Sequence, residues 1–216
     1  MIQNKCKIIG LTGGIGSGKT SAKNILQEKG YVVVDSDLIA RQVVEKNKPA
    51  YFKVVEEFGQ EILGGDKTID RKALGDIIFK DVNKRKTLEG ILYPYIFEEI
   101  KREVELNCTK KSQVIFIDIP LLFENIGPIL ESGIKFDMVW LIYCDRNTQI
   151  ERLIKRNNIS KEKALLRINA QMDIEKKKEL ADLVIENMTT KEQLRKDLFK
   201  SLSALEKEKI WRANCL

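Results

Sequence analysis

The segment KIIGLTGGIGSGKT, residues 7–20, decides the fold expected for this chain. Its first half is rich in apolar residues, as in a short buried strand, and Gly13 to Thr20 fit the pattern G-x-x-x-x-G-K-[ST]. A strand, this glycine-rich turn and a helix together make a phosphate-binding loop, or P-loop. The segment therefore predicts a nucleotide site between the first strand and the first helix.

The residue types in this loop match the chemistry of a triphosphate. Glycine lets the backbone approach phosphate oxygens, and successive N–H groups before a helix form an anion-binding nest. Lys19 reaches the β and γ phosphates as a point charge, and the hydroxyl of Thr20 suits Mg²⁺. A turn without ligand is the simpler alternative, and a dinucleotide fingerprint fits less well because Lys19 stands where glycine is needed. The predicted ATP-binding residues of the loop are Gly13, Gly14, Ile15, Gly16, Ser17, Gly18, Lys19 and Thr20.

Outward from the loop, strand-like and helix-like segments alternate, which is typical of a parallel sheet covered by helices. The expected strands are 7–12, 31–35, 113–118, 138–144 and 183–186. Helical periodicity is expected over 21–29, 38–46, 50–58, 71–79, 96–106 after Pro94, 147–156, 160–172 and from Thr190 onward. We expect an α/β fold with three layers, a five-stranded parallel sheet, a helical substrate-binding subdomain and a helical lid.

The same order of elements gives an expected domain organisation. Residues 1–216 form a single P-loop domain, because this length suits one α/β core with a small insertion. The core comprises about 1–46, 107–146 and 180–216, the helical subdomain about 47–106 and the lid about 147–179.

Composition excludes several classes of function. The 216 residues include no histidine, which removes Ser-His-Asp, Cys-His and most catalytic zinc chemistry. The formal net charge is +6, but most basic residues alternate with acidic ones, so we expect a small polyanionic substrate and no nucleic-acid partner. No run approaches the roughly 18 apolar residues of a membrane span, and we expect no membrane partner.

The cysteine pattern predicts free thiols. The four cysteines lie far apart without CxxC spacing, which fits reduced thiols in a cytoplasmic protein better than a disulfide framework or a zinc site. They are Cys6, Cys108, Cys144 and Cys215.

Carboxylates at strand ends are the candidates for acid–base and metal chemistry. Asp35 and Asp37 end the second expected strand, at the sheet edge that carries the P-loop. We favour Asp37 as the catalytic base for an acceptor hydroxyl, with Lys19 as the catalytic cation; the alternative is that Asp37 only caps the helix 38–46. Asp118 ends the third expected strand, where an acid can hold Mg²⁺, although a simple turn residue fits equally well.

Arginines in the expected lid can neutralise phosphate charge. Arg152 and Arg156 stand four residues apart, hence on one helix face, and Arg167 can join them from the next helix. For each arginine a solvated salt bridge is the alternative. A signalling GTPase is disfavoured, because the segments beginning at Asn47 and Asp118 do not complete its guanine and switch motifs. Phosphoryl transfer to a small acceptor remains.

With these residues in place, the chain resembles the dephospho-CoA kinase family along nearly its whole length. The segments that carry the resemblance are GLTGGIGSGKT (10–20), DSDLIAR (35–41), FG (58–59), DR (70–71), PLLFE (120–124), QM (171–172), AD (181–182) and Asn187. The resemblance implies transfer of the γ-phosphoryl group of ATP to the ribose 3′-hydroxyl of dephospho-CoA, with Mg²⁺. It also implies that 47–106 binds CoA, that Asp37 is the general base and that Asn187 lies near adenine.

The family resemblance further implies that Arg41 and Arg71 lie on the acceptor side. One departure is Tyr93, which stands before Pro94 where family members often have histidine. Two other readings stay open: another small-molecule or nucleotide kinase of similar architecture, and a nucleotide-dependent regulatory protein without transfer activity. The sequence predicts no particular oligomeric state.

Overall fold

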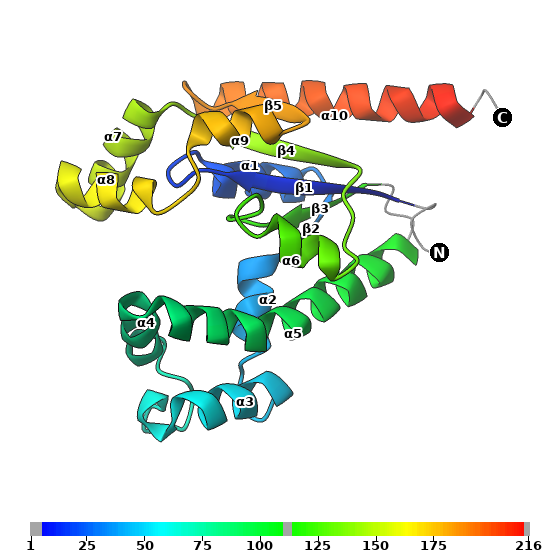
Figure 1. The fold of residues 1–216 in the computed structure, drawn as a ribbon. Helices are drawn as coiled ribbons and strands as arrows, with labels where there is room; N and C mark the ends of the chain where they lie inside the picture. Colours follow the sequence, from blue (N-terminus) through cyan, green and yellow to red (C-terminus); the bar gives the residue numbers. More distant parts are fainter. Residues whose placement is uncertain (1–5, 110–113, 214–216) are drawn as a thin grey trace.

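The computed structural model describes residues 6–109 and 114–213, and its centre is a five-stranded parallel sheet (Figure 1). The strand order is β2-β3-β1-β4-β5, and each neighbouring pair runs parallel. The strands are β1 (Lys7–Gly13), β2 (Val32–Asp35), β3 (Val114–Asp118), β4 (Met138–Tyr143) and β5 (Leu183–Glu186). The five expected strands are confirmed to within a residue or two, except that Gln113 lies outside the described residues.

Helices cover both faces of the sheet. On one face, Ile9 and Leu11 of β1 pack with α1 (Lys19–Glu28) and α10 (Lys191–Ala213). On the other, Ile115 and Ile117 of β3 pack with α5 (Val82–Thr109) and α6 (Ile126–Glu131). Residues that alternate along each strand thus enter opposite cores, as the period of two requires. The three-layer α/β fold is confirmed.

Two groups of helices project from this core, one on the side of the sheet where α5 lies and one beyond the end of β1 that leads into the P-loop (Figure 1). One group has a small apolar cluster of its own around Val54, Phe58 and Ile62, which the beginning of α5 joins through Leu88. The other has a separate cluster around Leu153 and Ile168. The first group holds α3 (Pro49–Phe58), the 3₁₀ turn Gln60–Ile62 and α4 (Arg71–Lys80), and the second holds α7 (Arg146–Asn157) and α8 (Lys161–Asn169). Helix α2 (Ser36–Gln42) packs in the sheet core through Ile39 and leads to the first group, and α9 (Ile174–Leu180) packs on β4 through Ile174.

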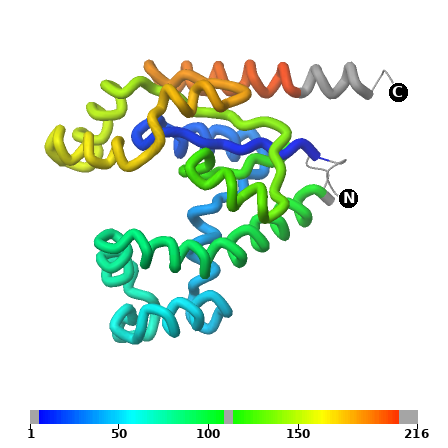
Figure 2. The backbone as a smooth tube through the Cα atoms, viewed as in Figure 1, coloured from blue at the N-terminus to red at the C-terminus, as the bar shows by residue number. Residues whose placement is uncertain are grey.

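Helix α5 corrects the expectation that a helix starts after Pro94. It runs for 28 residues with Pro94 in its interior, from the projecting helices to the back of the sheet (Figure 2). A proline inside a helix costs about 3 kcal/mol. Its early residue Leu88 and its late residues Ile100 and Val104 are buried in different clusters, and each fully buried side chain of this kind contributes about 1.5–3 kcal/mol. Packing at both ends therefore outweighs the local penalty.

Smaller differences occur at other helices. The short helices α6 and α9 were not expected, because six or seven residues carry too little periodicity to stand out. Ser160 and Thr190 are N-caps of α8 and α10, since their hydroxyl oxygens accept from the N–H groups three residues on. In the described residues, no helix combines the length and apolar character needed to cross a membrane.

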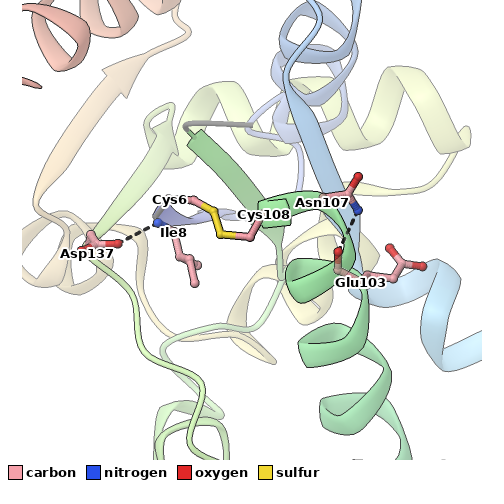
Figure 3. The surroundings of a disulfide bond; sticks show 6 residues. All are labelled: Cys6, Ile8, Glu103, Asn107, Cys108 and Asp137. Atoms are coloured by element: carbon pink, nitrogen blue, oxygen red, sulfur yellow. Dashed lines mark hydrogen bonds between the residues drawn. A yellow bond between two sulfur atoms is a disulfide. The ribbon is translucent and has the colours of Figure 1, made fainter. Parts of the chain in front are cut away.

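The cysteine expectation is wrong for one pair. Cys6, directly before β1, and Cys108, near the end of α5, form a disulfide with a Cα–Cα distance of 5.9 Å (Figure 3). The two residues are 102 positions apart in sequence, so only the return of α5 along the sheet brings them together. Cys144 is a buried free thiol, and Cys215 lies outside the described residues.

Reduction of this disulfide should lower the free energy of unfolding by about 2–5 kcal/mol, because the bond closes a long loop and restricts the unfolded chain. Urea unfolding with and without dithiothreitol measures the difference. The double variant Cys6→Ala/Cys108→Ala is the control and should not respond to the reductant. Thiol titration of the denatured, unreduced protein should find two of the four cysteines free; four free thiols would contradict the pairing.

Candidate active site

The P-loop joins β1 directly to α1 and is shaped by protein contacts as much as by its glycines. Gly18 has φ +90°, a conformation that side chains rarely adopt, and a Cβ built on it would lie 2.1 Å from Nδ2 of Asn187. The loop closes on itself where Ser17 N–H donates to the carbonyl of Gly14 at 3.0 Å. Glycine is therefore required at Gly18 by the fold of the loop itself, before any ligand is considered.

The outward-facing carbonyl groups of the loop are bound by side chains. Arg152 Nη1 donates to the carbonyl oxygen of Gly16 at 3.3 Å, and Asn187 Nδ2 donates to that of Ser17 at 2.8 Å. Arg152 Nη2 also donates to the carbonyl of Asn187 at 2.8 Å. With these carbonyls held outside, the remaining N–H groups of the loop, other than those of Ile15 and Ser17, which donate within the protein, are left for an anion, as in a backbone nest.

The P-loop forms one wall of a cavity of about 840 Å³. Its lining is rich in basic side chains on the lid side, and it includes one carboxylate, that of Asp37. The residues that line the cavity are Gly13, Gly14, Ile15, Gly16, Gly18, Lys19, Thr20, Ser21, Asp37, Pro120, Arg152, Lys155, Arg156, Gln171, Asn187, Thr189, Lys191 and Leu194. The fold thus brings together the candidate base, Lys19 and Thr20, and the lid arginines 152 and 156. Sequence reasoning missed Lys155, which had no motif to mark it.

A cluster of two acids and two lysines lies at the ends of β2 and β3. Asp35 and Asp118 are register partners on β2 and β3, and Asp118 is 3% exposed. Lys19 Nζ forms an ion pair with Asp118, while Lys23 Nζ lies 2.5 Å from Asp35 and 3.8 Å from Asp118. Sequence reasoning missed Lys23, although its spacing of four from Lys19 on a helix places both on one face.

The pKa values of the two acids in this cluster are shifted in opposite directions. Burial raises the pKa of Asp118 above its ordinary value, although the charge of Lys19 opposes the shift. Burial also acts to raise the pKa of Asp35, but the hydrogen bonds from Lys23 and from the Leu38 N–H outweigh it and hold that pKa below its ordinary value. Asp118 is thus a buried carboxylate whose charge is stabilised by its ion pair with Lys19.

Asp35, and not Asp37, caps the helix that follows β2. Asp35 has extended backbone angles, and its Oδ1 accepts from the Leu38 N–H at 3.0 Å. The helix α2 starts at Ser36, two residues before the expected start, so Asp37 falls in its first turn. The alternative that Asp37 is the N-cap is therefore wrong. The side chain of Asp37 is exposed and lines the P-loop cavity.

The remaining arginine candidates lie outside the phosphate cavity. Arg41 is exposed on α2, one helical turn after Asp37, and Arg71 is exposed at the start of α4. Arg167 is exposed near the end of α8. Within the described residues none of these three lines the cavity.

Tyr93 has a structural contact in place of the histidine that family members often have. Its Oη donates to Asn125 Oδ1 at 2.8 Å, and its ring centroid lies 5.2 Å from that of Phe97. Burial raises the pKa of Tyr93 to about 12, so the phenol remains a donor near neutral pH. The side chain thus joins α5 to the residue that precedes α6.

The residues at the cavity suit Mg²⁺ better than a metal bound by the protein alone. Thr20 is exposed in the cavity, and Asp118 lies beneath Lys19. No cluster of three or more acidic, cysteine or histidine side chains suited to a metal occurs in residues 6–109 and 114–213. Mg²⁺ commonly takes one or two protein oxygens and completes its shell with phosphates and water, so this sparse donor set fits.

Comparisons with known proteins agree over most of the chain. A family model described as dephospho-CoA kinase matches residues 7–193. A dephospho-CoA kinase of Bacillus cereus is 45% identical over 191 residues, which cover 87% of this chain and 93% of the relative. The solved dephospho-CoA kinase from Campylobacter jejuni is 28% identical with a TM-score of 0.69, covering 94% of this chain and 98% of that one. A shikimate kinase from Acinetobacter baumannii shares the fold, with a TM-score of 0.50 and 16% identity over 94% and 95% of the two chains.

Proposed function

The chain belongs to the dephospho-CoA kinase family, and from this premise we propose how its P-loop cavity performs the family's reaction. The reaction transfers the γ-phosphoryl group of ATP to the ribose 3′-hydroxyl of dephospho-CoA, gives CoA and ADP, and is the last step of CoA biosynthesis. The observation that carries the proposal is that Asp37 and the P-loop line the same cavity. A base and a triphosphate site on facing walls are what an in-line transfer to an alcohol needs.

In the proposed mechanism Asp37 is the general base. It aligns the 3′-hydroxyl and receives its proton as the bond from the 3′-oxygen to the γ-phosphorus forms and the bond from that phosphorus to the bridging oxygen of ADP breaks. A carboxylate suffices because the transition state is loose and the proton leaves late. The structural support is that Asp37 is exposed in the cavity and is free of the capping task, which Asp35 performs.

Charge stabilisation falls to the P-loop and the lid. Lys19 neutralises charge on the β and γ phosphates, for which it must exchange its ion pair with Asp118 for one with the nucleotide. Thr20 and Asp118 would hold Mg²⁺, which when bound supplies charge neutralisation across the phosphates. Arg152 and Arg156 add positive charge from α7, and Asn187, which also lines the cavity, is assigned to the neighbourhood of the adenine.

The acceptor is assigned to the opposite side of Asp37. Arg41 follows Asp37 by one helical turn and so shares its face of α2, which suits a phosphate of the acceptor. Arg71 belongs to the same role from α4. Residues 47–106 serve as the CoA-binding subdomain and 147–179 as the lid, within one domain. A cytoplasmic location is proposed from the reaction alone, because the pairing of Cys6 with Cys108 removes the support from free thiols.

An ADP-release assay with an acceptor panel tests the function. Dephospho-CoA should support turnover with kcat/KM at least roughly 100-fold above that for AMP, because an incomplete acceptor forfeits binding energy needed for alignment. Phosphorus NMR of the product should place the new phosphate on the ribose 3′ position. Preferred turnover of a nucleoside monophosphate would support a different kinase, and ATP binding without acceptor-dependent turnover would support a regulatory protein.

A further inference from the structure

The backbone of Ile15, in the P-loop, is held on both sides by glutamine side chains from the two ends of the lid. The Ile15 N–H donates to Gln171 Oε1 at 2.9 Å, and Gln149 Nε2 donates to the Ile15 carbonyl oxygen at 2.9 Å. Gln149 lies on α7, and Gln171 follows α8. A backbone N–H can only donate and a carbonyl can only accept, so the orientation of each amide is fixed by its partner.

Gln149 packs closely against the glycines of the P-loop. Gln149 is 2% exposed, and a Cβ built on Gly14 would lie 2.3 Å from its Nε2. The Gln149 backbone carbonyl also lies 3.2 Å from the position of a Cβ on Gly16. Two glycines of the phosphate-binding loop are thus needed so that α7 can approach the loop. The side chain of Ile15 joins the same assembly by packing on the lid cluster around Leu153.

Gln171 is held in place by a buried brace. The N–H of the next residue, Met172, donates to Glu124 Oε1 at 3.0 Å, and Lys177 Nζ lies 2.7 Å from the same oxygen. Lys177 is fully buried, and its contact is an ion pair by distance without hydrogen-bond alignment. Such a pair contributes little net stability after desolvation, so its use here is to fix geometry. Glu124, in the turn after β3, thus connects Lys177 of α9 to Met172, the residue next to Gln171.

We propose that Gln149 and Gln171 are positioning residues that lock the lid to the phosphate-binding loop through the backbone of Ile15, with Glu124 and Lys177 holding Gln171. The inference rests on the proposed function of the cavity and extends it. Through this lock, the placement of Arg152, Lys155 and Arg156 over the nucleotide is tied to the shape of the loop. The positive charges of the lid are then held in a fixed position relative to the backbone N–H groups of the loop.

The two glutamines have opposite hydrogen-bonding roles, which gives a sharp test. Gln171 must accept, so Gln171→Glu keeps the contact whereas Gln171→Met removes it at similar size. Gln149 must donate, so both Gln149→Met and Gln149→Glu remove it. Gln193→Met is the matched control, because the Gln193 side chain bonds to Asp197 on the surface of α10.

Three properties are measured for each variant. They are the amide hydrogen exchange of the peptide covering residues 13–20 without nucleotide, the affinity for a fluorescent ATP analogue, and the values of kcat and KM. Gln171→Met and both Gln149 variants should exchange about tenfold faster and lose about tenfold in kcat/KM for ATP, the effect of one lost hydrogen bond of about 1.4 kcal/mol. Gln171→Glu should keep wild-type exchange, because a carboxylate accepts from the Ile15 N–H as the amide oxygen does. Gln193→Met should match wild type.

Equal hydrogen exchange of residues 13–20 in Gln171→Glu and Gln171→Met would overturn the proposal, as would wild-type exchange and kinetics in all variants. A fall in urea stability with unchanged KM and kcat would assign the glutamines to folding alone. If the Gln149 variants do not fold, the half-buried Gln171 pair decides the question. Failure of the proposed function looks different: the wild-type chain itself would then not turn over dephospho-CoA, while exchange and analogue binding still report on the lock.

Discussion

The Lys19→Ala variant should phosphorylate dephospho-CoA at least about 1,000-fold more slowly than wild type, because it loses the mobile cation that neutralises charge on the transferred phosphoryl group. The loss should appear in kcat as well as in kcat/KM, since the interaction is strongest in the transition state. Steady-state ADP release at saturating ATP and dephospho-CoA measures it. A variant that retained more than about a tenth of wild-type kcat would contradict the role of Lys19.

The same substitution leaves the buried Asp118 without its nearest cation, so stability must be separated from catalysis. We expect the free energy of unfolding to fall by up to about 3 kcal/mol, because Lys23 still faces Asp118 at 3.8 Å. The double variant Lys19→Ala/Asp118→Asn removes the unpaired charge and should recover stability. It should not recover the rate, and recovery of both would show that Lys19 acts only in folding.

The Asp37→Asn variant should lose about 100- to 1,000-fold in kcat while its KM for ATP stays within about threefold, because it removes a proton acceptor and leaves the nucleotide site intact. Its urea midpoint should match wild type, since Asp37 makes no capping hydrogen bond. Asp35→Ala is the matched control two residues away. It removes the cap of α2 and the partner of Lys23, and it should lower the free energy of unfolding by about 1–2 kcal/mol. Wild-type kcat in Asp37→Asn would exclude Asp37 as the base.

The sheet could be predicted from sequence because its signals are local. Each strand is a short apolar run between polar turns, and the run that leads into the P-loop is marked by a motif with a known structural context. The interior position of Pro94 and the pairing of Cys6 with Cys108 could not be predicted. Both depend on where α5 lies against the sheet, which is a property of tertiary packing and leaves no periodic trace in the sequence.

The candidate site likewise has features that the sequence predicts and features that depend on tertiary packing. The motif identified the loop residues that line the cavity, and strand-end position placed Asp35 and Asp37 at the edge of the sheet that carries this loop. Spacing alone could not say which carboxylate caps α2, because the answer depends on the extended backbone of Asp35. Nor could it show that Gln149 and Gln171 meet at the backbone of Ile15, since these residues come together only when the lid folds onto the loop.

The side chains that bind the P-loop carbonyls have a thermodynamic consequence for nucleotide capture. Ordering one free backbone residue costs about 1–2 kcal/mol, so a loop that took shape only around its ligand would forfeit several kcal/mol of affinity. Here Arg152 and Asn187 fix the conformation of Gly16 and Ser17 during folding, ahead of any encounter with ATP. The entropy cost of ordering the loop therefore lowers the stability of the folded protein and not its affinity for ATP. Most of the free energy of the phosphate contacts then contributes to binding.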